Sequence, residues 1–140
     1  MISPSSSSNP AQAPVRKRRV FVVEDHPLMR RSIVEAIDRE PDLVTCGQAE
    51  DRPETRAIAS VGADVVLTDL QLKSSSGLDL IKELRVCLPA LPVIATTMFD
   101  VRRNERLARE AGATGFVAKG DGPDRMIAMI REALSKGEQG

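Results

Sequence analysis

Four short apolar runs, separated by helical patterns, constrain the fold of this chain more than any other feature. They lie at residues 20–23, 65–67, 93–95 and 116–118, and each contains valine. Each run has the length of a strand, and β-branched residues favour strands. Strands that alternate with amphipathic helices predict a parallel sheet covered by helices.

The full pattern consists of five strand–helix units. The predicted strands are residues 19–24, 43–47, 64–69, 93–96 and 115–118, and the helices begin near 27, 53, 77, 100 and 123, the last ending near 135. Pro27 suits a first helical turn, and Ser76 with Asp79 has the spacing of a capping box. The chain is therefore predicted to form one three-layer α/β sandwich with right-handed crossovers.

Composition and charge exclude several functional classes. With 41% apolar residues, a 140-residue chain buries one substantial core. The 20 acidic and 20 basic residues cancel, which argues against nucleic acid as a partner of this chain. No apolar run approaches the roughly 18 residues of a membrane span, and no signal-like apolar segment precedes Arg16. We therefore expect a cytoplasmic protein with no membrane contact, in which the isolated Cys46 and Cys87 are buried thiols.

The two ends of the chain differ from its middle. Residues 1–15 are rich in Ser, Pro and Ala and show no periodicity, and four basic residues follow at 16–19. Such a segment cannot bury enough surface to offset its ordering entropy. The predicted organisation is a disordered tail over 1–17, a folded domain over 18–137 and a short tail over 138–140.

Polar side chains that could handle a phosphoryl group follow four of the predicted strands. They are Glu24 and Asp25, Asp69, Thr96 and Thr97, and Lys119. The carboxyl ends of parallel strands meet at one edge of the sheet, where ligands bind in open α/β folds. Three carboxylates, a hydroxyl and an amine at that edge predict a metal-assisted phosphoryl site.

In this order, with Gly77 eight residues after Asp69, the motifs resemble the receiver domains of bacterial two-component response regulators. The resemblance covers about residues 18–136. Two segments, EDHPL at 24–28 and GATGF at 112–116, are most similar to the NarL/LuxR-type branch. The resemblance implies a flavodoxin-like, doubly wound sheet of order 2-1-3-4-5.

The resemblance also implies a role for each residue of the acidic group. Asp69 would be the phosphoacceptor, receiving a phosphoryl group from a histidine kinase or a histidine phosphotransfer protein. Mg²⁺ would be held by Glu24, Asp25, Asp69 and the backbone carbonyl of Gln71, since this ion prefers oxygen ligands. A carboxylate is already ionised at neutral pH and needs no base to act as a nucleophile.

A hydroxyl and an amine complete the implied set. Thr97 is preferred to Thr96 because it lies 28 residues after Asp69 and 22 before Lys119. Lys119 would pair with the new phosphoryl oxygens. Thr97 and Phe116 would act as the switch, Phe116 turning toward the core and remodelling a face made by the fourth helix, fifth strand and fifth helix, where an unknown output protein binds. The protein would be a monomer or a phosphorylation-dependent dimer.

Some positions depart from the pattern. Lys73 stands where the family usually has proline, and Met98 and Phe99 are large residues that could shield an acyl phosphate.

Several functions stay open at this point. We expect a stand-alone receiver that catalyses its own phosphorylation and slow dephosphorylation without being a conventional enzyme. The alternatives are the regulatory half of a LuxR-type transcription factor and a pseudo-receiver that works without phosphorylation. An aspartyl phosphatase is disfavoured, because Gln71 replaces the second acidic residue that such enzymes often carry.

Overall fold

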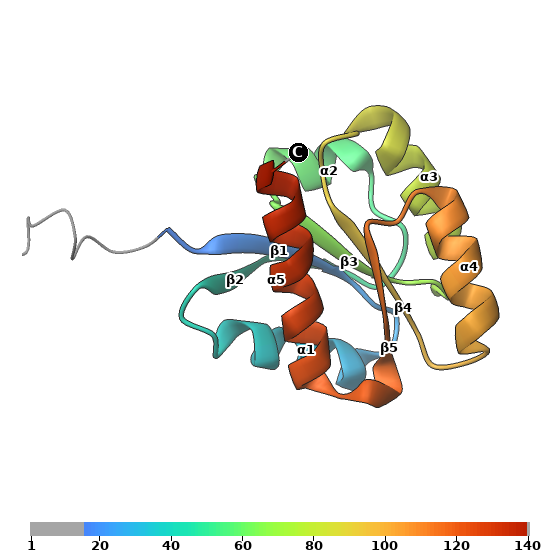
Figure 1. The fold of residues 1–140 in the computed structure, drawn as a ribbon, viewed down its shortest axis with the longest axis horizontal. Helices are drawn as coiled ribbons and strands as arrows, with labels where there is room; N and C mark the ends of the chain where they lie inside the picture. Colours follow the sequence, from blue (N-terminus) through green and yellow to red (C-terminus); the bar gives the residue numbers. More distant parts are fainter. Residues whose placement is uncertain (1–15, 140) are drawn as a thin grey trace, which may run out of the picture.

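The computed structural model describes residues 16–139 and contains one five-stranded sheet in which all strands are parallel. Its strands are β1 (Arg18–Val23), β2 (Leu43–Ala49), β3 (Val65–Asp69), β4 (Val93–Thr97) and β5 (Gly115–Ala118). They lie in the order β2-β1-β3-β4-β5, with β3 in the middle (Figure 1). The predicted topology is confirmed.

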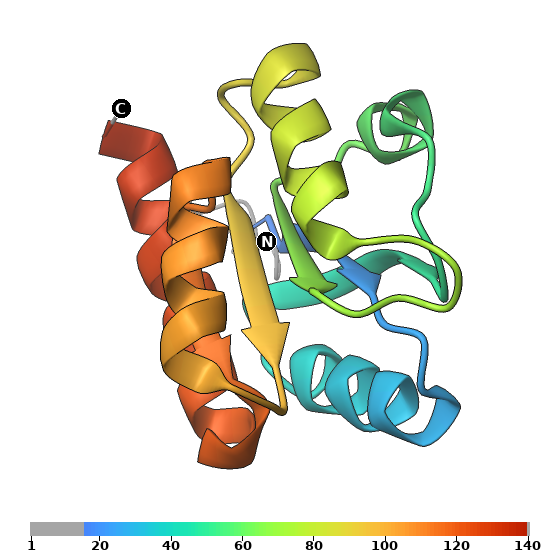
Figure 2. The same ribbon diagram turned by 90° about the vertical axis from the view of Figure 1, so that its right-hand side faces the viewer.

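Helices cover both faces of the sheet and make it a three-layer sandwich (Figures 1 and 2). On one face lie α1 (Pro27–Asp38) and α5 (Pro123–Gln139). On the other lie α2 (Thr55–Ser60), α3 (Gly77–Cys87) and α4 (Val101–Ala111). A short 3₁₀ turn, η3 (Lys119–Asp121), joins β5 to α5.

The core is divided between the two faces by the alternation of side chains along each strand. Val20 and Val22 of β1 pack in the cluster that contains Ile130 of α5, whereas Phe21 and Val23 pack in the cluster that contains Leu80 of α3. Successive side chains of a strand point to opposite faces, so a strand covered on both sides reads as a continuous apolar run. This is why the apolar runs identified the strands.

The helix beginnings near the sheet's carboxyl edge are fixed by local caps. His26 caps α1, its Nδ1 accepting a hydrogen bond from the N–H of Met29 at 3.3 Å. Ser76 caps α3 by accepting from the N–H of Leu78 at 3.1 Å. Both caps lie in loops that leave the predicted site, so they fix where the site's loops enter the helices.

The largest differences from the predicted element boundaries are in β2, α2 and α5. β2 continues to Ala49 rather than ending near 47, because it pairs with β1 along its whole length across a bulge at Val20 and Phe21. α2 is shorter than predicted and starts at Thr55. α5 continues to Gln139 instead of ending near Ser135, and an ion pair at 3.6 Å joins Glu132 to Lys136, the first residue of this extension.

The prediction of two buried thiols is wrong. Cys87 is exposed at the end of α3, beyond the buried stripe that ends at Leu84, and Cys46 is half-buried because β2 is an edge strand. The predicted tail over 1–17 lies almost wholly outside the described residues. Within residues 16–139, no helix has the length and apolar content needed to cross a membrane.

Candidate functional site

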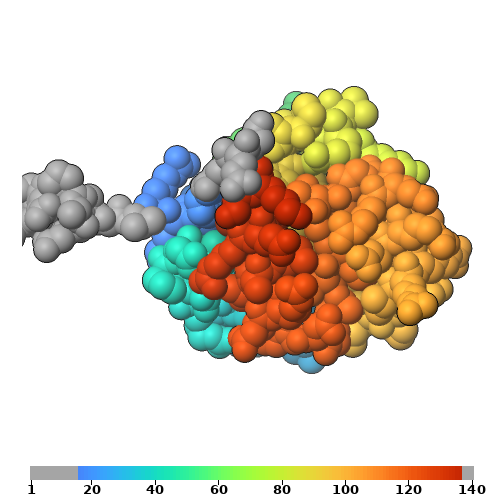
Figure 3. All heavy atoms as spheres, viewed as in Figure 1, coloured from blue at the N-terminus to red at the C-terminus, as the bar shows by residue number. Residues whose placement is uncertain are grey.

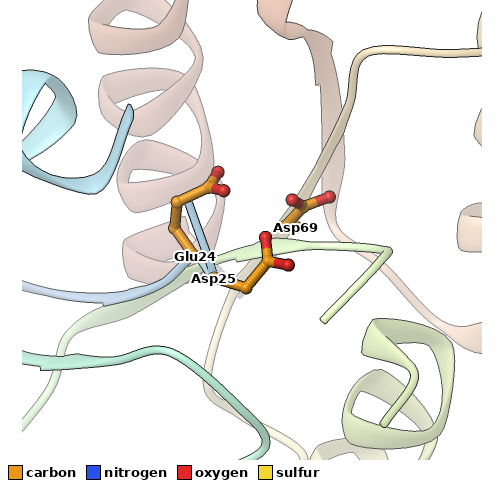
Figure 4. A group of neighbouring side chains, drawn as sticks. All are labelled: Glu24, Asp25 and Asp69. Carbon is orange, nitrogen blue, oxygen red and sulfur yellow. The ribbon is translucent and has the colours of Figure 1, made fainter. Parts of the chain in front are cut away.

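Three carboxylates meet at the carboxyl edge of the sheet. Glu24 and Asp25 directly follow β1, and Asp69 is the last residue of the neighbouring β3. One carboxylate oxygen from each lies within 4.8 Å of the others, at the ends of the two strands (Figure 4). The parallel pairing of β1 with β3 is what brings these residues together, although they are far apart in the sequence.

Lys119 places its ammonium between two of these carboxylates. Its Nζ lies 2.7 Å from Oδ2 of Asp69 and 2.5 Å from Oε1 of Glu24, and its side chain is only 5% exposed. Burial alone would lower the pKa of Lys119, but hydrogen bonds and charges from Asp69 and Glu24 outweigh it, so the pKa is raised. Lys119 is therefore held in its charged form.

Glu24 lies deepest in the acidic group. It is 1% exposed, and Oε2 accepts a hydrogen bond from the N–H of His26 at 3.1 Å. Burial raises its pKa, the negative charge of Asp69 adds to this, and Lys119 offsets part of it. Oε1 contacts the ammonium of Lys119 at 2.5 Å.

The charge of the site fits a hard divalent cation. Three carboxylates face one ammonium, so the group carries excess negative charge when all four are ionised. Mg²⁺ is bound through carboxylates together with retained waters, and it would neutralise this excess.

The acidic group opens into a pocket of about 350 Å³. Asp25, Asp69 and Lys119 lie inside it, and His26, Met29, Met98 and Phe99 form the sides. Met98 and Phe99 are 51% and 72% exposed. A small phosphorylated molecule or a partner side chain can therefore reach Asp69 past an apolar rim.

The loop after β3 is tied down on both sides. The N–H of Gln71 donates to Oδ1 of Asp69 at 3.1 Å, which orients the carboxylate. Further along, the hydroxyls of Ser74 and Ser75 donate to Asp51 on the loop after β2, and they hold the pKa of Asp51 well below its usual range. Lys73 pairs with Glu50 at 3.5 Å and is not among the residues that line the acidic pocket.

Thr97 lies at the end of β4 and is fully buried. Its hydroxyl contacts Oε1 of Gln71 at 3.4 Å and the carbonyl of Phe99 at 3.2 Å. It accepts from the N–H of Phe99 and from Nδ2 of Asn104, both at 3.3 Å. Among the described residues, Asp69 is not a hydrogen-bond partner of Thr97.

Phe116 is also buried, at 7% exposure, and packs with Ala108 and Ala111 of α4. It contributes to a second pocket, of about 220 Å³, with Val101 of α4 and Met129 of α5. Figure 3 shows α4 and α5 side by side on this face. Phe116 thus connects the core to the surface on which the sequence places an output protein.

Comparison with known proteins identifies the family. Residues 20–131 match the response regulator receiver domain. The chain belongs to this family. Strand order, the acidic group at the ends of β1 and β3 and the lysine after β5 agree with the match.

The similar proteins place this receiver in the NarL/LuxR-type branch. It is 32% identical over 122 residues to the nitrate/nitrite response regulator protein NarP of Escherichia coli (strain K12), which covers 86% of this chain and 56% of that protein. It also resembles the structure of a LuxR-family two-component response regulator from Aurantimonas sp. SI85-9A1, with a TM-score of 0.80, 28% identity and 86% of each chain covered. The chain spans about half the length of the curated relatives it matches.

Another solved relative is the response regulator domain of Thermotoga maritima CheB, with a TM-score of 0.77 and 26% identity over 86% of this chain and 98% of that one. Receiver domains act in two-component signalling, where they interact with histidine kinases and output domains, and they bind Mg²⁺ through acidic residues. The acidic group of this receiver is compatible with that general property.

The sequence predicted part of this site. It predicted that Glu24, Asp25, Asp69 and Lys119 share one edge of the sheet, and the structure brings them together. The contact between Thr97 and Asn104 was not anticipated, because no sequence spacing marks an asparagine in the first turns of a helix as the partner of a strand-end hydroxyl.

Proposed function

We propose that this receiver accepts a phosphoryl group on Asp69. The observation that carries the proposal is the position of Lys119, whose ammonium contacts both Asp69 and the buried Glu24 in a pocket open to solvent. A buried ammonium beside the attacking carboxylate is suited to pair with the extra negative charge that a phosphoryl group adds.

In the proposed reaction, a carboxylate oxygen of Asp69 attacks the phosphorus of a phosphohistidine. An O–P bond forms, the P–N bond breaks, and its electron pair stays on the imidazole nitrogen, which takes a proton from water. The N–H of Gln71 orients the attacking carboxylate, and Lys119 pairs with the oxygens that arrive. The donor is a histidine kinase or a histidine phosphotransfer protein.

Glu24, Asp25, Asp69 and the backbone carbonyl of Gln71 are the proposed ligands of Mg²⁺. When bound, this ion neutralises charge between the carboxylates and the phosphoryl oxygens. The mutual distance of the three carboxylates and the burial of Glu24 support this assignment. Asp25 borders the pocket and is placed to reach both the ion and the donor.

The proposed output is a change at the α4–β5–α5 face. After phosphorylation, the Thr97 hydroxyl donates to the phosphoryl group, and the loop that follows β4 moves with it. Phe116 then turns toward the core and changes the shape of the pocket beside α4. This alters the surface that is offered to an output protein or to a second copy of the receiver. We further propose that the protein works in the cytoplasm.

Intact mass tests the proposed function. Incubation with phosphoramidate and Mg²⁺ is expected to add about 80 Da, one phosphoryl group, to the wild type. Asp69→Asn should gain nothing, and EDTA should abolish the gain. Asp124→Asn, a matched change at an exposed position of α5, should react like the wild type.

A wild type that stays unmodified by phosphoramidate, and also by a phosphorylated histidine phosphotransfer protein, would overturn the proposal. Modification of Asp69→Asn at the wild-type rate would show that another residue is the acceptor.

A further inference from the structure

The carboxamide of Asn104 connects α4 to the end of β4. Its Nδ2 donates to Oγ1 of Thr97 at 3.3 Å and to the carbonyl of Phe99 at 2.7 Å. A carboxamide nitrogen has two N–H donors, so it can make both bonds at once. One side chain in the first turns of α4 therefore holds both ends of the 97–99 segment.

The hydroxyl that Asn104 holds is the one that the proposed function needs elsewhere. A threonine hydroxyl has one proton and two acceptor lone pairs. In this structure the Thr97 hydroxyl donates toward Oε1 of Gln71 and the carbonyl of Phe99, and its oxygen accepts from the N–H of Phe99 and from Nδ2 of Asn104. To donate to an oxygen on Asp69, Thr97 must withdraw its proton from Gln71 and Phe99, and the rotation of its side chain that this requires moves Oγ1 away from Nδ2 of Asn104.

The backbone between the two residues is strained. Asp100 has φ of 47°, the only positive φ of a non-glycine residue among the described residues. At the start of a helix, aspartate normally takes an extended conformation and caps the first turn, but Asp100 makes no such side-chain bond. Contacts across the loop, among them those of Asn104, therefore hold it in a conformation that its own residues disfavour.

We propose that Asn104 is a positioning residue that holds the Thr97 hydroxyl away from Asp69 until a phosphoryl group competes for it. The inference rests on the proposed function of Asp69. When only a fraction of the molecules has the reactive conformation, the apparent rate of phosphorylation is reduced to that fraction of its full value. Loss of the Asn104 bonds raises the fraction of reactive molecules, and therefore raises the rate of phosphorylation. Asn104 acts on the unphosphorylated state and leaves the hydrolysis of the phosphorylated state unchanged.

The test measures phosphorylation by phosphoramidate and later loss of the phosphoryl group, both by intact mass. Asn104→Ala and Asn104→Leu remove the donor, and the second retains most of the volume. Both are expected to phosphorylate about fivefold faster, the factor for one neutral hydrogen bond, with unchanged hydrolysis. Arg106→Ala, at an exposed position of the same helix, is the control and should match the wild type.

Asp100→Gly tests the inference independently, because it should change the rate of phosphorylation in the opposite direction. Glycine tolerates the left-handed backbone, so this variant stabilises the held loop and should phosphorylate about twofold to fivefold more slowly. Amide resonances of residues 97–100 provide a readout without reaction. In unphosphorylated Asn104→Ala they should move toward their positions in the phosphorylated wild type.

The outcomes separate the inference from the proposed function. A wild type that gains no mass overturns both. A wild type that is phosphorylated, with Asn104 variants that react at the same rate or more slowly, overturns the inference alone. Equal changes in the rates of phosphorylation and hydrolysis would show a general structural role for Asn104, and this result would also overturn the inference.

Discussion

At the scale of single residues, the charges gathered in the acidic pocket lower the stability of the fold and favour the reaction of Asp69. Three carboxylates are placed within reach of one another, and two of them, Glu24 and Asp69, are buried. Like charges at this spacing repel, and burial adds a desolvation cost. Lys119 offsets only part of this repulsion and desolvation cost. The pocket therefore favours the binding of a cation and the addition of a phosphoryl group.

The rim of the pocket is expected to control how long the acyl phosphate lasts. Phe99 is 72% exposed yet lines the pocket, so its ring restricts the approach of water to Asp69. Phe99→Ala should shorten the lifetime of the phosphorylated form several-fold and should speed phosphorylation by small donors. The gain of mass during incubation with phosphoramidate measures phosphorylation, and the later loss of that mass measures the lifetime.

Val86→Ala is the matched control, because Val86 is 81% exposed on α3 and lies outside the pocket. An unchanged lifetime in Phe99→Ala would show that the rim does not limit the access of water.

The residues that the sequence could identify are those whose place follows from strand ends. Glu24, Asp69 and Lys119 each sit at the carboxyl end of an apolar run, and parallel pairing alone brings such positions to one edge. The bonds of Thr97 depend on how one loop folds back onto α4. That conformation includes a positive φ at Asp100, which local sequence disfavours and therefore does not predict.

At the scale of elements, the predicted strands and helices are all present, and the errors lie at their ends. Periodicity identifies which residues face the core, but an end depends on partners elsewhere. β2 is extended by its pairing with β1, and α5 continues past Ser135 to Gln139. Cys87 is exposed because the buried stripe of α3 ends at Leu84, before the helix does.

The close packing of α3 against the end of β3 gives a prediction at this scale. A methyl group at Gly77 would overlap the carbonyl oxygen of Asp69 and lie 2.8 Å from Cα of Leu70. Gly77→Ala is therefore expected to lower the free energy of unfolding by about 1–3 kcal/mol, the usual cost of overpacking. Urea denaturation at fixed pH measures the loss.

Gly120→Ala is the matched control. A methyl group at position 120 meets nothing within 4 Å, so the unfolding free energy of this variant should stay close to that of the wild type. If the two alanine variants were equally stable, the close approach of α3 to Asp69 would not constrain the fold.

At the scale of the whole molecule, titratable groups with opposite pKa shifts set how stability depends on pH. Burial raises the pKa of Glu24 above its ordinary 4.5, so its contribution to stability is complete below about pH 4.5 and is lost as pH rises through the folded-state pKa. Hydrogen bonds from Arg131 lower the pKa of Asp42, and Ser74 and Ser75 lower that of Asp51. Asp42 and Asp51 therefore stabilise the fold above pH 3.8, their ordinary pKa, and this stabilisation is lost in stronger acid.

These opposing signs predict a stability maximum on the acid side of neutrality when metal is removed. In EDTA, the unfolding free energy should fall as pH rises from about 4.5 toward neutrality, and millimolar Mg²⁺ should abolish this decline because the ion binds the ionised carboxylates. Urea denaturation across this range measures both profiles.

Glu24→Gln should remove the decline in EDTA, because the group responsible no longer titrates. At pH 7 it should exceed the metal-free wild type in stability by about 1 kcal/mol, as is common when a strained functional site is relaxed, and it should gain less from Mg²⁺. Glu110→Gln, at an exposed position of α4, should keep the wild-type profile. A Glu24→Gln profile that declines like the wild type would mean that Glu24 does not carry the pH dependence, and that the cost of burying the acidic group lies in its other members.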